Sequence, residues 1–262
     1  MKERIIKSGQ EVLGKVIVET VMPAMREAYL KNGFVGIGER SFDILHAKPE
    51  YLHQEDPGFE FDRKRLNSEP GLIISNHPGP GDCPAVLNAL TRKDMKFLVA
   101  EESIKGEKLD TFLPPDMLLG ASKDMGMLRG AISTIKKHIE NGGALFYFPT
   151  GLVPSHGEAE FASLFAALVR EIPPESMVYA FNINASDIQK VTKKTTFAAR
   201  TTSDFLLPKI LKPITKIGEP STIRIDERYT NVDQWLDAFK SSGRSKNEMN
   251  HVMTNFYRGL FV

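Results

Sequence analysis

The chain has 262 residues, of which 41% are apolar and 26% charged, a composition that is typical of a folded domain and excludes long disordered stretches. Its 34 basic and 33 acidic residues give a formal charge of +1, so we expect no nucleic-acid partner. The single cysteine, Cys83, excludes an intramolecular disulfide and a cysteine-rich zinc module, and it suits a reducing cytoplasm.

The sequence shows no membrane-spanning or secretory pattern. No apolar run approaches the roughly 18 residues that a spanning helix needs. The start of the chain, MKERIIKSGQEV, returns to polar residues too soon for a signal peptide. We therefore expect a cytoplasmic protein whose only contact with a membrane is peripheral, on the inner face.

Two short helices are predicted at the N-terminus. Apolar residues recur at helical spacings in QEVLGKVIVETVMPAMREA. Pro23 suits the first turn of the second helix, and Asn32-Gly33 suits its end. We interpret residues 1–33 as a helical hairpin that packs on the main domain, and a location of the same hairpin on a membrane surface is the alternative.

Residues 34–70 give a weaker pattern. FVGIGERSFDIL predicts a short strand, and HQEDPGFEFDRKRLNSEP is rich in turn formers and charges. We expect a long, partly ordered connection between the hairpin and the first clear strand.

The remaining chain alternates short apolar runs with helical periods. Such runs are typical of strands buried on both faces, so residues 34–262 are predicted to form one α/β domain with a largely parallel central sheet flanked by helices. Asp82 is expected to cap a helix that carries Pro84 in its first turn, and Gly142-Gly143 to end another. The predicted strands lie in LIIS, KFLVAE, DMLLGAS, ALFYFP, MVYAFNI and, as two strands, ITKIGEPSTIRIDE.

The segment LIISNHPGPGDC (72–83) contains the main catalytic candidates. His77 and Asp82 are separated by Pro-Gly-Pro-Gly. Because proline fixes φ and glycine permits unusual backbone angles, this loop is stiff and can bring the two side chains together. A histidine oriented by a carboxylate is a general base, and since no G-x-S-x-G nucleophile is present, its target is a hydroxyl or amine of a substrate. The alternative is a capping Asp82 and a hydrogen-bonded loop histidine.

The segment N-H-P-G-P-G-D resembles the N-H-x-x-x-x-D block of the phospholipid/glycerol acyltransferase superfamily. Members of that family move an acyl group from acyl-CoA or acyl carrier protein to glycerol 3-phosphate or a lysophospholipid. ALFYFPTG is similar to the family's strand ending in F-P-E-G, and KIGEP to its F-G-E-P strand. IPPESMVYAFNI takes the place of the fourth block, and the order and spacing agree over residues 70–225.

The resemblance implies an acyltransferase that needs no metal or other cofactor. His77 is then the general base and Asp82 its orienting partner: His77 takes the acceptor proton as the acceptor attacks the thioester of acyl-CoA or acyl carrier protein, and an N–H group stabilises the oxyanion. The acceptor is lipid-like or small, and peripheral contact with an anionic membrane is expected. The implied substrate-binding residues are Asn76, Gly79, Lys123, Arg129, Pro149, Thr150 and Gly151.

Two blocks differ from the family pattern. Thr150 replaces the usual Glu and no Arg follows in LVPSHGE, so the loop lacks a carboxylate and the bidentate phosphate contact of an arginine. This favours an acceptor other than glycerol 3-phosphate. In the second block Lys123, followed by Arg129, stands for the usual Arg. Lys123 either meets a phosphate as a point charge or is a solvated loop residue.

Three further features have two open interpretations each. His156 follows the FPTG turn and either points into the site or lies on the surface. Met117, Met125 and Met127 either line a groove for an acyl chain or fill the core. Residues 188–218 hold seven basic side chains against one acidic, which suits anionic lipid, an acidic carrier protein or a solvated face.

Two other functions compete with acyl transfer. The first is a divergent family member that binds acyl lipid or a membrane without catalysis. The second is a thioesterase-like hydrolase, in which Cys83 paired with His77, or a water activated by His77, attacks the thioester. A cysteine beside an acidic residue in the first turn of a predicted helix is more typical of a packed small apolar residue.

Overall fold

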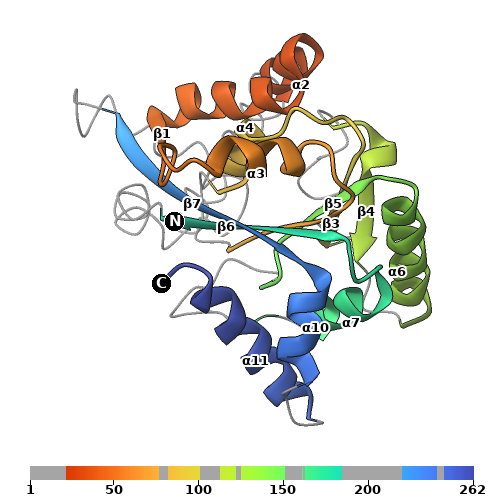
Figure 1. Ribbon diagram of the computed structural model, residues 1–262. Coiled ribbons are helices and arrows are strands. Elements are labelled where there is room, and N and C mark those ends of the chain that lie inside the picture. The colour runs from red at the N-terminus through yellow and green to blue at the C-terminus, as the bar shows by residue number, and fades with distance from the viewer. Residues whose placement is uncertain are drawn as a thin grey trace, which may run out of the picture.

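The computed structural model describes residues 22–76, 82–100, 113–121, 125–150, 161, 163–184, 220–240 and 245–262. In this part of the chain seven strands form one sheet in the order β1-β7-β6-β2-β5-β3-β4, and helices cover both of its faces (Figure 1). The strands are β1 (Ala47–Tyr51), β2 (Gly71–Ser75), β3 (Met95–Ala100), β4 (Leu118–Ala121), β5 (Ala144–Tyr147), β6 (Met177–Asn184) and β7 (Ser221–Asn231). The helices are α2 (Met22–Leu45), α3 (Phe59–Leu66), α4 (Asp82–Asn88), the 3-10 turn η3 (Pro115–Met117), α6 (Met125–Glu140), α7 (Ser163–Glu171), α10 (Val232–Lys240) and α11 (Lys246–Gly259).

Five of the strands point the same way. β6, β2, β5, β3 and β4 pair in parallel, whereas β7 is antiparallel to β6 and β1 is parallel to β7. β2 and β5 are buried along their whole length, which explains their continuous apolar runs. The predicted α/β domain with a largely parallel central sheet is confirmed.

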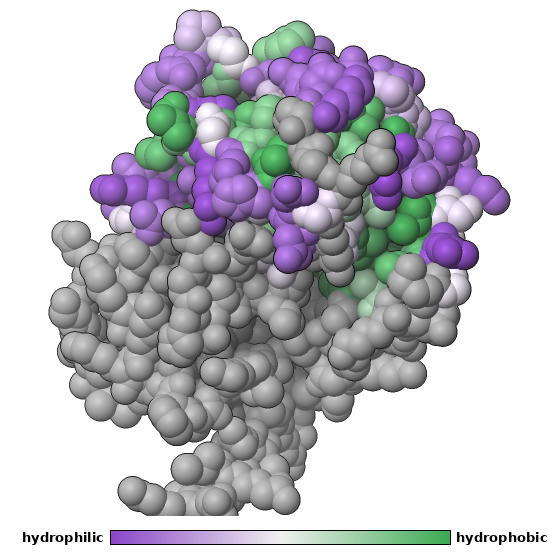
Figure 2. Space-filling view, turned by 90° about the horizontal axis from the view of Figure 1, so that it is seen from below, coloured by the Kyte–Doolittle hydropathy of each residue, from purple (hydrophilic) through white to green (hydrophobic). Residues whose placement is uncertain are grey.

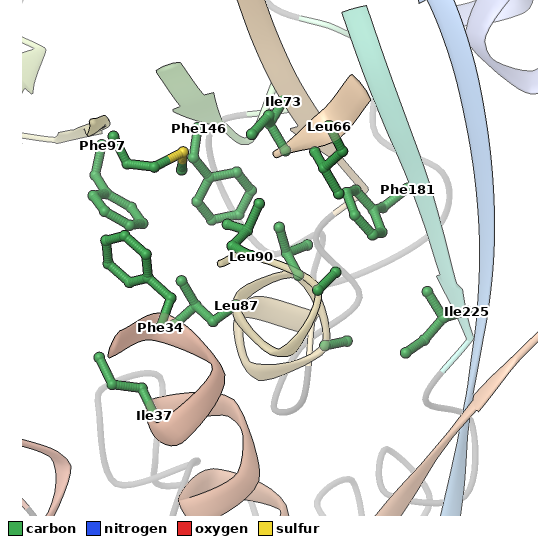
Figure 3. Close-up of a cluster of buried hydrophobic side chains, with 14 of the residues drawn as sticks. Phe34, Ile37, Leu66, Ile73, Leu87, Leu90, Phe97, Phe146, Phe181 and Ile225 are labelled. Carbon is green, nitrogen blue, oxygen red and sulfur yellow. The ribbon is translucent and has the colours of Figure 1, made fainter. Parts of the chain in front are cut away.

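Two apolar layers join the helices to the sheet, because successive side chains of a strand point to opposite faces. In the first layer, Phe34 of α2 and Leu87 of α4 lie on the same side as Ile73 of β2 (Figure 3). Leu72 and Ile74 of the same strand belong to the second layer, where they meet α6, α7, α10 and α11. β2 is therefore covered on both faces.

α2 consists of two helical segments joined by a kink. Asn32 (φ −140°, ψ 20°) and Gly33 (φ 61°, ψ −145°) leave the helical region, a conformation that glycine adopts readily. The predicted helix end at Asn32-Gly33 and the place of Pro23 in the first turn are confirmed. The first helix of the predicted hairpin lies outside the described residues, and the predicted boundary after residue 33 falls at the kink.

Residues 34–45 are helical, so the strand predicted there is wrong. The buried side chains of Phe34 and Ile37 follow helical spacing, but glycines lower intrinsic helix propensity and weaken the pattern. Gly38 is required by packing: a Cβ at this position would lie 2.6 Å from the backbone nitrogen of Asn88 in α4. The helix is thus stabilised by a close contact that the local sequence does not reveal.

The segment between α2 and β2 contains β1 and α3, so the expected long, partly ordered connection is also wrong. β1 has only five residues, which alternate between half-buried and exposed. α3 begins at Phe59, and its N-cap residue, Gly58, offers no side-chain hydrogen bond. Neither element has the long periodic pattern or the capping residue that would predict it.

The predicted positions of two helix ends further along the chain are confirmed. α4 begins at Asp82 and carries Pro84 in its first turn, so Asp82 lies inside the first turn and its predicted role as the N-cap stays a prediction. α6 ends at Glu140, just before Gly142, whose positive φ of 93° suits glycine. Of the two strands predicted in ITKIGEPSTIRIDE, the second is β7, and the first lies outside the described residues.

The surface of the described part mixes polar and apolar side chains, as the face in Figure 2 shows. Large apolar side chains are exposed at Leu30, Phe61, Met127 and Val262, of which the first three lie on different helices. Single exposed apolar residues of this kind are ordinary. Within the described ranges no helix has the length and apolar character needed to cross a membrane.

Candidate functional site

β2 and β5 are neighbouring strands, and the next described helices in the sequence, α4 and α7, pack on opposite faces of the sheet. β2 is followed by α4, which packs in the first apolar layer, and β5 is followed by α7, which packs in the second. In open α/β sheets ligands bind where two connections diverge in this way, beyond the carboxyl ends of the strands. The ends of β2 and β5 are therefore the candidate site.

The two strands end at the same level. Ile74 of β2 pairs with Tyr147 of β5, so two residues further on Asn76 and Pro149 follow the strands in matching positions. Because Asn76 immediately precedes His77, the N-H-P-G-P-G-D and ALFYFPTG segments start from adjacent strands at one edge of the sheet. The sequence alone did not establish this proximity.

The side chain of Asn76 continues the pairing of β2 with β6. Its Oδ1 accepts a hydrogen bond from the backbone N–H of Ile183 at 2.7 Å, and its Nδ2 donates to the carbonyl of Ile183 at 2.9 Å. The amide thereby holds the residue that precedes His77. These bonds give Asn76 a structural part, and its predicted contact with substrate stays a prediction.

A hydroxyl from the C-terminal helix α11 lies at the same point. Tyr257 Oη accepts a hydrogen bond from the backbone N–H of Asn76 at 3.0 Å and donates one to the carbonyl of Phe181. Burial raises the pKa of the Tyr257 phenol, so this hydroxyl keeps its proton at neutral pH. Tyr257 therefore bridges β2 and β6 at the end of β2.

Asp82 lies at the start of α4 and is only 3% exposed. Its Oδ1 accepts a hydrogen bond from the backbone N–H of Cys83 at 2.5 Å, and a carboxylate is favourable at this end of a helix. His77 lies outside the described residues, so the predicted His77–Asp82 pair stays a prediction. Cys83 is half-buried against the first apolar layer.

Thr150 carries the most unusual polar atom near the candidate site. It follows the buried Pro149 at the end of β5. Its Oγ1 is buried and, among the residues that the structure describes, has no hydrogen-bond partner. An unpaired buried hydroxyl costs roughly 1–3 kcal/mol. The predicted role of Thr150 and Pro149 in binding substrate stays a prediction.

A row of aromatic rings links α2 to the candidate site. The ring centroids of Phe34 and Phe97 are 5.4 Å apart, those of Phe97 and Phe146 5.7 Å, and those of Phe146 and Phe148 4.9 Å. Phe148 directly follows β5 and is half-buried. Phe148 therefore gives the candidate site an apolar side chain on the face of the sheet where α2 and α4 pack.

The other predicted residues lie on different elements or outside the described part. Arg129 is exposed on α6. Met127 is exposed on the same helix, which begins at Met125, and Met117 is half-buried, with its sulfur accepting a hydrogen bond from the Tyr29 hydroxyl at 3.7 Å. Outside the described residues lie His77, Gly79, Lys123, Gly151, His156 and the basic stretch 188–218.

Tyr257 is the site residue that sequence reasoning missed. It lies in α11, and its spacing is that of any residue on an apolar helix face. The hydrogen bonds of its hydroxyl, across 181 and 76 positions of the chain, distinguish it. In the described part of the chain, no three His, Cys, Asp or Glu side chains gather as a metal site.

Comparison of the sequence with models of known protein families gave no match, and a search of curated proteins found no relative. The resemblance to the acyltransferase superfamily therefore stays a prediction.

Proposed function

We propose that the protein is an acyltransferase that moves a fatty acyl group from a thioester, acyl-CoA or acyl carrier protein, to a hydroxyl or amine of a lipid-like or small acceptor. His77 is the general base and Asp82 orients it. The observation that carries the proposal is the adjacency of β2 and β5: the two segments that resemble the family's first and third blocks follow neighbouring strands at one edge of the sheet.

The chemistry at this edge is consistent with the proposal. His77 removes the acceptor proton as the acceptor oxygen or nitrogen attacks the thioester carbonyl, and the thiolate of the donor then leaves. Phe148 offers an apolar surface near the end of β5, which suits an acyl chain. Thr150 supplies a neutral hydroxyl in place of a carboxylate, which suits an acceptor other than glycerol 3-phosphate.

The test is the release of thiol from acyl-CoA and from acyl carrier protein with a panel of hydroxyl and amine acceptors. His77→Ala should lower kcat by roughly 10²–10⁴-fold, the usual contribution of a general base. His251→Ala, an exposed histidine on α11, is the matched control and should leave turnover unchanged. Unchanged turnover in a folded His77→Ala variant rejects the proposal.

Two further measurements separate the proposal from its competitors. Cys83→Ala should keep full activity, because the thiol has no part in direct transfer. Transfer to an added acceptor should exceed release of free fatty acid, which a hydrolase would produce instead. We propose that the enzyme acts in the cytoplasm with peripheral contact to the inner face of an anionic membrane, and sedimentation with anionic and neutral vesicles tests this location.

A further inference from the structure

We propose that Tyr257 is a positioning residue for this reaction: its hydroxyl, bridging Asn76 and Phe181, sets the direction in which the chain leaves β2 immediately before His77. The catalytic consequence rests on the proposed function. The structural part rests on described residues of β2, β6 and α11.

The hydroxyl of Tyr257 adds a second, shorter acceptor to a bond of the regular strand pairing. β2 and β6 are in register up to the pair formed by Ser75 and Phe181. One residue later, the backbone N–H of Asn76 is 3.4 Å from the carbonyl oxygen of Phe181 and 3.0 Å from Tyr257 Oη. Because hydrogen bonds weaken with length, the phenol is the better acceptor for this N–H.

Asn76 is held from two directions. Tyr257 binds its backbone N–H, while its side-chain amide binds both the N–H and the carbonyl of Ile183. Consecutive Cα atoms are about 3.8 Å apart across a rigid planar peptide, so fixing Asn76 restricts where His77 begins. The position of His77, the proposed general base, therefore depends on a residue of α11.

The ring of Tyr257 is itself fixed. It is 5% exposed, and its centroid lies 5.1 Å from that of Phe161 and 5.1 Å from that of Phe261. Thr254, one turn earlier on α11, accepts a hydrogen bond from the backbone N–H of Phe161 at 2.8 Å. Because its ring is held in place, the phenol cannot move with β2 if the strand shifts. A phenylalanine at position 257 keeps the packing of the ring but removes the two hydrogen bonds that join Asn76 to Phe181.

Tyr257→Phe should impair the reaction step more than substrate binding. Without the hydroxyl, the N–H of Asn76 keeps only its longer hydrogen bond, 3.4 Å, to the carbonyl of Phe181. Shortening of that bond then shifts the residue before His77. A misplacement of about 1 Å at a reacting group costs on the order of 100-fold in rate. We expect kcat to fall roughly 10- to 100-fold and the acceptor KM to change by less than about threefold.

The matched control is Tyr179→Phe. Tyr179 is also buried, and its hydroxyl donates to Glu227 at 2.7 Å, but its ring lies in the first apolar layer, whereas Tyr257 lies in the second. Both variants lose one buried hydroxyl with a hydrogen bond. Only Tyr257→Phe should alter the pH dependence of kcat.

A second readout does not depend on activity. NMR of the protein labelled with ¹⁵N in its imidazole rings reports each histidine separately, and the His77 signal is the one that His77→Ala removes. In Tyr257→Phe the His77 signal and its titration midpoint should shift, while the signals of the other histidines stay in place. In Tyr179→Phe the His77 signal should not move.

An unchanged His77 signal or an unchanged kcat in Tyr257→Phe overturns the inference, as do equal losses of activity in the two tyrosine variants. A failure of the proposed function is distinguishable, because His77→Ala would then leave acyl transfer unaffected. In that case the NMR comparison of the two variants still decides whether Tyr257 positions His77.

Discussion

The guanidinium of Arg63 on α3 forms a bidentate ion pair with the carboxylate of Glu227 on β7. Arg63 Nε donates to Oε2 at 2.6 Å and Nη2 donates to Oε1. The hydroxyl of Tyr179 donates to the same carboxylate at 2.7 Å, and the guanidinium lies 4.4 Å from the ring centroid of Tyr51. The ion pair therefore connects α3 to the sheet. Because the side chain of Glu227 is only 2% exposed, either charge would be strongly destabilising if its partner were removed.

Arg63→Met should therefore destabilise the protein by about 3–5 kcal/mol, because it leaves the Glu227 carboxylate buried without its counter-charge. The double variant Arg63→Met/Glu227→Leu should recover much of that loss, since both buried charges are then gone. Urea unfolding of the two variants and the wild type measures the difference. A single variant as stable as the wild type would contradict the expectation.

Stability should fall at alkaline pH because of the tyrosines. Burial raises the pKa of every tyrosine phenol, that of Tyr229 to about 12, and in Tyr179 the Glu227 carboxylate adds to the effect. A phenol whose folded pKa exceeds its unfolded value of about 10 binds its proton more tightly in the folded state. Its contribution to stability is therefore full below pH 10 and is lost as the pH rises through the folded pKa.

The measurement is a titration that follows tyrosinate absorbance and circular dichroism together. Most tyrosinate should appear only as the protein unfolds, above the ordinary pKa of about 10. Tyr179→Phe should reduce the steepness of the loss of stability with pH. Complete ionisation near the ordinary value, with circular dichroism intact, would show that the phenols are not protected.

Gly38→Ala should destabilise the packing of α2 on α4. The added Cβ would lie 2.6 Å from the backbone of Asn88, which no side-chain movement can relieve, and overpacking of this kind costs roughly 1–3 kcal/mol. Gly130→Ala is the matched control within α6, because a Cβ there meets nothing within 4 Å. Alanine is the better helix former by about 1 kcal/mol, so thermal unfolding should move in opposite directions for the two variants.

Thr150→Val should leave the stability of the ligand-free protein unchanged or raise it. The hydroxyl it removes is buried and has no partner in the described part of the chain, and replacing such a group by an apolar one of the same shape costs little. Under the proposed function the acceptor KM should rise in Thr150→Val but not in Thr150→Ser. A clear drop in melting temperature for Thr150→Val would instead assign the hydroxyl a structural bond.

The central sheet was predictable because its pattern is local. LIIS, ALFYFP and MVYAFNI are short apolar runs between turn signals, and each is a strand buried on both faces. Asp82 and Gly142 mark helix ends by their own conformational preferences. These features depend on a few neighbouring residues, so one sequence is sufficient to read them.

The features that were missed depend on distant partners. From the sequence alone Gly38 only weakens a helix, whereas in the structure it allows α2 to pack closely against α4. β1 is recognisable as a strand only from its pairing with β7. Asn76 reads as part of a catalytic motif, although both ends of its amide bind β6. Tertiary contacts of this kind override local propensity, and a single sequence carries no record of them.

The bridge from Tyr257 to Asn76 also has a consequence for synthesis. β2 leaves the ribosome early, but the hydroxyl that completes its end belongs to a residue 181 positions later. Contacts between residues so far apart form late, since the loop between them must close first. A nascent chain that already contains every strand of the sheet still lacks the bridge at the end of β2, so full activity should appear only after α11 has docked.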